Sequence, residues 1–102
     1  MLEGVYTLGV WRVKPGSEQE FIASWKRLGR VFASLPRPPS DRGRLVRSVS
    51  DPVLFYSFGP WRSEEDVEAM RGNARAADAV RELVALCDEA TPGVFRVVAE
   101  SQ

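Results

Sequence analysis

Two copies of one short motif contain hydroxyl and tryptophan side chains that could line a pocket. The motif YTLGVWR recurs 50 residues later as YSFGPWR. Thr7 and Ser57 occupy equivalent positions, and the alternation of a strand places each on the same face as the tryptophan four residues later. If helices cover that face, two hydroxyls and the indoles of Trp11 and Trp61 enter one pocket. Alternatively, the tryptophans are core residues and each hydroxyl satisfies nearby backbone.

The chain contains no histidine and a single cysteine. Histidine is the commonest general base near neutral pH and the commonest metal ligand, so its absence argues against a metal site and against the usual nucleophile systems. The cysteine, Cys87, falls in register with apolar residues of an expected helix, and we expect a buried thiol. Any chemistry must then depend on carboxylates, tyrosine, arginine, amides or the reactivity of the substrate itself.

Length and charge limit the classes of protein that fit. The 102 residues suffice for one domain, over residues 1–102, and 14 basic residues balance 14 acidic ones without clustering. Nucleic acid and anionic lipid are therefore not expected partners. No apolar run reaches the ~18 residues of a membrane span, and the start of the chain does not resemble a signal peptide. We expect a cytoplasmic protein.

Helical periodicity indicates two helical regions. The first starts at a capping box over residues 17–20 and ends by Pro36. The second is capped by Ser63, is interrupted at residues 72–73 and resumes over residues 75–89. One stripe of the first helix carries the large apolar residues Phe21, Trp25, Leu28, Phe32 and Leu35. The inward residues expected for the second are Ala77, Val80, Leu83, Val84 and Cys87.

Four strands are expected around these helices. One contains the first motif, and the others cover residues 45–50, 53–61 and 94–99, the last after a stop signal at residues 91–93. Residues 36–44 form a proline-rich surface loop. The order βαββαβ predicts an α+β, ferredoxin-like fold: a four-stranded antiparallel sheet with the helices on one face.

The second face of this sheet is unusually apolar. Tyr6 and Leu8 point away from the tryptophan side of their strand, and Leu54, Tyr56 and Phe58 do the same in the longest strand. Because an exposed face of this kind favours aggregation, we predict that the sheet of a second subunit covers it in a homodimer.

Several segments resemble the antibiotic biosynthesis monooxygenase family of dimeric α/β barrels. They are VKPG at residues 13–16, LVRS followed by DP within residues 45–52, and FGPWRSEE at residues 58–65. The resemblance implies ferredoxin-like subunits that pair sheet to sheet, each with a ligand pocket. It also implies a monooxygenase that needs no cofactor, neither metal nor flavin, and that oxidises a small aromatic, quinol or polyketide-type substrate with dioxygen.

The resemblance also suggests catalytic residues. Trp61 and Arg81 match positions of the anthrone-oxidising members, while Ser57 replaces an asparagine and Val67 replaces a tyrosine. We expect Trp61 and Ser57 to orient the substrate and Arg81 to stabilise its anion. The alternative for Arg81 is a solvated surface residue.

Four further residues are expected to bind substrate: Thr7, Trp11, Met70 and Arg47. Haem-degrading members carry a tryptophan and a histidine where this chain has Met70 and Val80, so the resemblance does not extend to haem. With two polar positions of the oxygenases replaced, a second hypothesis remains open. It is a non-catalytic dimeric protein that binds a small ligand or has an accessory role.

Overall fold

The computed structural model describes residues 4–102 and has the expected βαββαβ order, with the second helical region divided in two. Its strands are β1 (Val5–Val13), β2 (Arg44–Arg47), β3 (Leu54–Trp61) and β4 (Cys87–Arg96). Its helices are α1 (Glu18–Ala33), α2 (Glu64–Arg71) and α3 (Ala74–Ala85). Within residues 4–102, no helix has the length and apolar character needed to cross a membrane.

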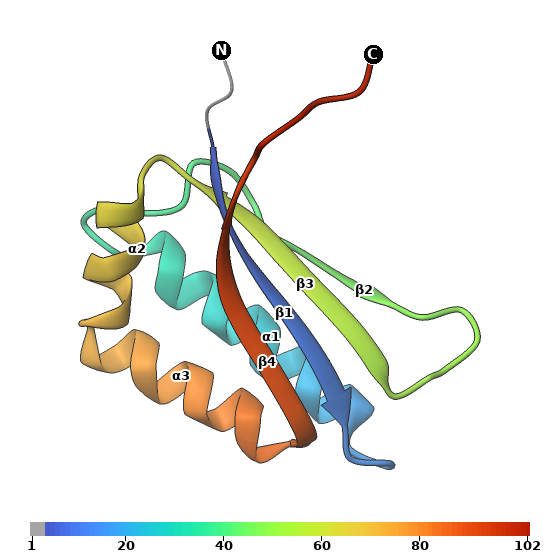
Figure 1. The fold of residues 1–102 in the computed structure, drawn as a ribbon. Helices are drawn as coiled ribbons and strands as arrows, with labels where there is room; N and C mark the ends of the chain where they lie inside the picture. Colours follow the sequence, from blue (N-terminus) through green and yellow to red (C-terminus); the bar gives the residue numbers. More distant parts are fainter. Residues whose placement is uncertain (1–3) are drawn as a thin grey trace.

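All strand pairs are antiparallel, in the order β2-β3-β1-β4. The three helices pack on one face of this sheet and leave the other face uncovered (Figure 1). The ferredoxin-like fold predicted from the sequence is therefore confirmed. The covered face carries the buried residues of β1 and β3: Val5, Trp11, Val13, Phe55, Ser57 and Trp61.

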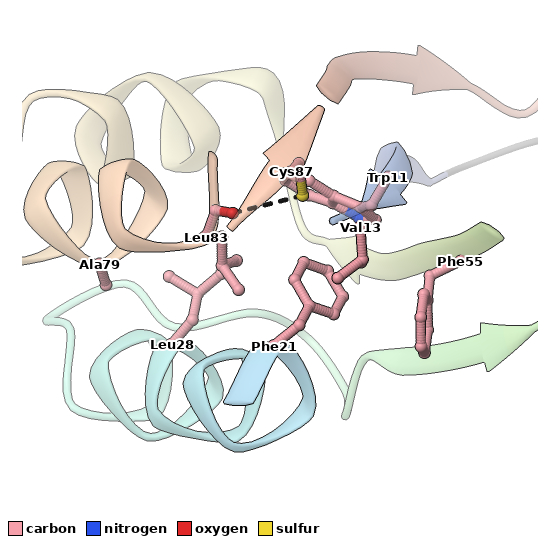
Figure 2. Close-up of a cluster of buried hydrophobic side chains, with 8 residues drawn as sticks. All are labelled: Trp11, Val13, Phe21, Leu28, Phe55, Ala79, Leu83 and Cys87. Atoms are coloured by element: carbon pink, nitrogen blue, oxygen red, sulfur yellow. Dashed lines mark hydrogen bonds between the residues drawn. The ribbon is translucent and has the colours of Figure 1, made fainter. Parts of the chain in front are cut away.

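The core consists of two neighbouring clusters. The larger one joins α1 and α3 to the sheet, and Figure 2 shows Leu28 and Leu83 meeting between the helices beside Phe21. Phe21 also packs against the rings of Trp11 and Phe55, with ring centroids 5.8 and 5.1 Å apart. The smaller cluster forms under α2 and the start of α3, from Val5, Trp61, Val67, Met70 and Ala76.

The prediction for the end of the chain was wrong in its boundaries. The last helix ends at Ala85 rather than residue 89, and β4 begins at Cys87 rather than residue 94. Residues 91–93 lie inside this strand, with Pro92 opposite Gly9 of β1. Because β4 is an edge strand, a proline without an N–H group fits there. Cys87 is buried as expected, and its thiol donates to the Leu83 carbonyl at 3.3 Å.

Two other local predictions also need correction. The strand expected over residues 45–50 ends at Arg47, because the Ser48 hydroxyl accepts the backbone N–H groups of Ser50 and Asp51 and closes a turn. At the start of α1, Ser17 makes no side-chain capping bond; the Glu18 carboxylate instead accepts the N–H of Gly16 at 2.8 Å.

The interruption of the second helical region follows the prediction. The Ser63 hydroxyl accepts the N–H of Asp66 and caps α2, and the Asn73 side chain accepts the N–H of Ala76 and caps α3. Val84, expected to point inward, is instead 43% exposed. The break turns α3 so that Ala76, Ala79 and Leu83 are its buried residues.

Candidate functional site

A cavity of about 810 Å³ lies on the helix-covered side of the sheet. Most of its wall comes from β1, β3, α1 and the loop over residues 34–43, and Met70 of α2 and Val80 of α3 also line it. Its volume falls within the range of small-molecule sites, and most of its lining is apolar. The fold therefore provides a site large enough for a small polycyclic aromatic molecule.

The two motifs meet in this cavity through reciprocal hydrogen bonds. The Trp11 indole N–H donates to the Ser57 hydroxyl at 2.9 Å, and the Trp61 indole N–H donates to the Thr7 hydroxyl at 3.1 Å. All four residues line the cavity. One alternative was that each hydroxyl satisfies nearby backbone. Among residues 4–102, each instead accepts a hydrogen bond from the tryptophan of the other motif.

The strand register explains this reciprocity. Trp11 lies opposite Phe55 and Thr7 lies opposite Gly59, so each indole reaches the residue two positions along the facing strand. Such diagonal neighbours are about 7–8 Å apart and within reach of a long aromatic side chain. Both bonds follow from the same register. The two copies of the motif are therefore related by an approximate local symmetry in the site.

Gly9 allows the Trp11 indole to lie close over its own strand. A Cβ atom at Gly9 would come within 2.6 Å of three atoms of that indole, which is closer than real Cβ contacts. The indole of Trp61 is held differently, by the edge of the Phe32 ring at a centroid distance of 5.3 Å. The sequence pattern showed the glycine of each motif but did not indicate this packing role.

The two hydroxyls keep a proton to offer. Ser57 and Thr7 act as acceptors toward the indoles, and neither donates a hydrogen bond to another residue of the described part of the chain. A hydroxyl can donate while it accepts. Two O–H donors with fixed oxygen positions are therefore available to a carbonyl or phenolate oxygen in the cavity.

Charge is confined to the exposed part of the lining. The charged lining residues are Lys26, Arg30, Asp41, Arg42 and Arg71, and all of them are exposed. No tyrosine of residues 4–102 lines the cavity. The interior therefore offers hydroxyls and aromatic surfaces but no side chain suited to act as a general base.

The structure separates the other expected site residues. Met70 lines the cavity and is buried. Arg47 lies over the Phe55 ring at 4.9 Å, beside a second, more open hollow of about 470 Å³. Arg81 is exposed on α3, forms an ion pair with Asp78 and does not line the cavity. Val67 belongs to the smaller core cluster.

Trp25, expected in the core, is only half-buried and lines both hollows. All three tryptophans of the chain therefore line the larger cavity. Sequence reasoning also missed the exposed cations Lys26, Arg30 and Arg42. The spacing of the first two on α1 was a signal, because residues four apart lie on one face of a helix.

Two groups with shifted pKa values lie outside the cavity. Burial raises the pKa of the Cys87 thiol, and a hydrogen bond from the Arg12 guanidinium lowers the pKa of the Asp51 carboxyl. Neither residue lines the cavity. Over residues 4–102, no three His, Cys, Asp or Glu side chains gather into a group that could hold a metal ion.

These features define a ferredoxin-like α+β protein with an apolar ligand cavity between its helices and sheet. The chain belongs to the antibiotic biosynthesis monooxygenase family, whose model matches residues 5–82. The match includes both motifs, all of α1 and α2 and most of α3, so the resemblance noted in the sequence is confirmed at the level of the family.

Solved structures with a similar fold include an oxygenase. SnoaB, a cofactor-independent oxygenase from Streptomyces nogalater, superposes with a TM-score of 0.82 at 18% identity, over 96% of each chain. A conserved protein from Methanosarcina mazei has a TM-score of 0.80 at 17% identity, over 93% of each chain. At these identities the similarity establishes the fold. Comparison with curated proteins gives no match.

Proposed function

We propose that this protein is a cofactor-independent monooxygenase that oxidises a small aromatic, quinol or polyketide-type substrate with dioxygen. The observation that carries the proposal is the cavity of about 810 Å³ in which Ser57 and Thr7 present O–H groups beside two fixed indoles. Family membership and the fold shared with SnoaB support it. Trp61 and Ser57 keep the orienting roles expected from the sequence.

The reaction needs no cofactor if the substrate supplies the electrons. A methylene group between two aromatic rings that share a carbonyl group loses a proton, and the resulting anion, with its charge on the carbonyl oxygen, passes an electron to dioxygen. The carbon and oxygen radicals then join in a peroxide, which takes up a proton and loses water to leave a carbonyl. Overall, CH₂ and O₂ become C=O and H₂O, and the substrate provides all the electrons.

The chain's own residues would assist this reaction by position and electrostatics. The hydroxyls of Ser57 and Thr7 can donate to the oxygen that carries the substrate's negative charge, and the apolar wall excludes water. Because no residue of the range 4–102 supplies a base in the interior, the proton would leave through solvent at the exposed side. Arg81 does not line the cavity and is assigned no role in this scheme.

The test uses 1,8-dihydroxyanthrone as the substrate under ¹⁸O₂. We expect quinone formation above the rate with heat-denatured protein, with one labelled oxygen in the product. The double variant Thr7→Val and Ser57→Ala removes both donors and should lose roughly 10²-fold in kcat. Ser50→Ala, at an exposed turn, is the matched control and should keep full activity.

A second candidate is a ligand-binding protein without catalytic activity. The absence of a base in the interior of the described cavity favours it. In that case the hydroxyanthrone would quench the fluorescence of the tryptophans, and oxidation would not exceed the denatured control. Binding without turnover of any hydroxyanthrone would therefore contradict the oxygenase proposal and support this candidate.

The proposed active form is a homodimer joined through the uncovered face of the sheet. Val46, Tyr56 and Phe95 lie on that face and are 46%, 47% and 54% exposed. Apolar side chains in this number on one face are typical of a protein interface. The cavity opens on the other side of the sheet, so each subunit would keep its own site.

A further inference from the structure

The exposed part of the cavity's lining carries an excess of positive charge. Four of its five charged residues are cationic, namely Lys26, Arg30, Arg42 and Arg71. The whole chain has no formal net charge, with 14 basic and 14 acidic residues. The positive charge is therefore a local property of the cavity's mouth, which we define by these residues together with Asp41.

Most of this charge has no carboxylate partner. Arg71 pairs with Glu68 at 3.3 Å, but Lys26, Arg30 and Arg42 form no ion pair with an acidic side chain within residues 4–102. The Asp41 carboxylate accepts the backbone N–H of Arg42 at 2.7 Å. The mouth thus presents three cations that are free to bind an anion.

The cations lie on different elements around one opening. Lys26 and Arg30 are one turn apart on α1, and Arg42 belongs to the loop over residues 34–43. Between them on α1, the exposed Gly29 also lines the cavity, and a Cβ atom placed there would have no neighbour within 4 Å. Long cationic side chains therefore flank an unobstructed entrance to an apolar interior.

We infer that the ligand of this cavity is an amphipathic aromatic anion. Its rings would occupy the interior between the indoles, and its acidic group, a carboxylate or sulfonate, would lie at the mouth near Lys26, Arg30 and Arg42. Guanidinium and ammonium groups bind such anions by charge-assisted hydrogen bonds. The inference rests on the proposed function and narrows its substrate class to aromatic compounds that carry an acid.

A pair of matched probes tests the inference. 1-Anilinonaphthalene-8-sulfonate and N-phenyl-1-naphthylamine share their rings and differ by the sulfonate. Titration at low salt should show about tenfold tighter binding of the sulfonate, since several weak surface contacts with the anion add together. Because all three tryptophans line the cavity, energy transfer from them reports the binding of each probe.

Charge variants identify the residues responsible. The double variant Arg30→Gln and Arg42→Gln should bind the neutral probe like the wild type and lose most of the preference for the sulfonate. The control is Arg27→Gln with Arg75→Gln, which removes the same charge from exposed residues that do not line the cavity. This control should keep the preference for the sulfonate. In the wild type, added salt should weaken that preference because it screens the charges.

The outcomes separate this inference from the proposed function. The inference of an anionic ligand would be contradicted if the two probes bound equally. It would also be contradicted if the Arg30 and Arg42 variant kept the preference for the sulfonate. In either case the cavity would remain a candidate site for aromatic ligands. If neither probe bound, both the anionic ligand and the proposed function would lose their binding site. The inference is supported if the Arg30 and Arg42 variant loses the preference for the sulfonate while its binding of the neutral probe is unchanged.

Discussion

Single side chains in this protein show how a hydroxyl can be used in two ways. Ser57 and Thr7 hold the indoles of Trp11 and Trp61 and still have protons to donate to a ligand. Ser24, in contrast, is 2% exposed and its hydroxyl has no hydrogen-bond partner among the described residues. A buried hydroxyl without a partner has lost its hydration and gained nothing in exchange.

Replacement of Ser24 should therefore stabilise the protein. Ser24→Ala removes the unsatisfied hydroxyl and introduces a better helix former, and we expect the free energy of unfolding to rise by about 1 kcal/mol. Urea denaturation measures the change. The control is Ser34→Ala, which removes a hydroxyl that donates to the Val31 carbonyl at 2.7 Å and should not stabilise. A less stable Ser24 variant would mean that this hydroxyl has a partner in solution.

The sequence predicted that the hydroxyl and the tryptophan of each motif share one face of the sheet, but not which residues they bind. Alternation along the strand correctly placed Thr7 and Trp11 on one face, because that periodicity is local. The bond from Trp11 to Ser57 depends on the register between two strands 46 positions apart, which no local pattern contains. The exposed position of Arg81 on α3 depends likewise on how the helix packs, rather than on its place in a motif.

The elements position the site through close packing at particular glycines. β1 can carry the Trp11 indole only because Gly9 has no side chain beneath it. On α1, Gly29 has open space around it and lies at the cavity's mouth. One glycine is therefore required by a contact, and the other leaves an entrance unobstructed at some cost to helix stability.

The same substitution at these two glycines should have opposite effects. Gly9→Ala places a methyl group 2.6 Å from the indole, so Trp11 must move, and we expect a loss of about 1–3 kcal/mol in the free energy of unfolding. Gly29→Ala, the matched control, should gain about 1 kcal/mol. Chemical denaturation followed by tryptophan fluorescence measures both. An unchanged stability for the Gly9 variant would show that the strand can shift without cost.

Among the helices and strands, the boundaries predicted from the sequence were least accurate at the end of the chain. Thr91, Pro92 and Gly93 are typical helix-stop residues, and the prediction used them to begin the last strand after them. They lie inside β4 because an edge strand tolerates a proline and because pairing with β1 extends to Cys87. Tertiary pairing with β1 overrode this local signal, and the helix had already ended at Ala85.

The whole molecule has two surfaces of different chemistry on opposite sides of one sheet. The helix side contains the cavity and its cationic mouth, and the uncovered side carries the half-buried Tyr6, Leu8 and Val10 together with more exposed apolar residues. The strands are apolar on both faces, which suggested a covering layer on each side, and the helices provide that layer on one side (Figure 1). On the other side, a second copy of the sheet would meet the same requirement.

The mass of the protein in solution tests the proposed homodimer. Light scattering at micromolar concentration should give twice the chain mass of 11.4 kDa for the wild type. Phe95→Glu places a charge on the uncovered face and should shift the mass toward 11.4 kDa, because a buried unpaired charge is costly. Val84→Glu is the control: Val84 is also exposed and apolar but lies on α3, so the dimer should persist. A wild-type mass of one chain would contradict the dimer.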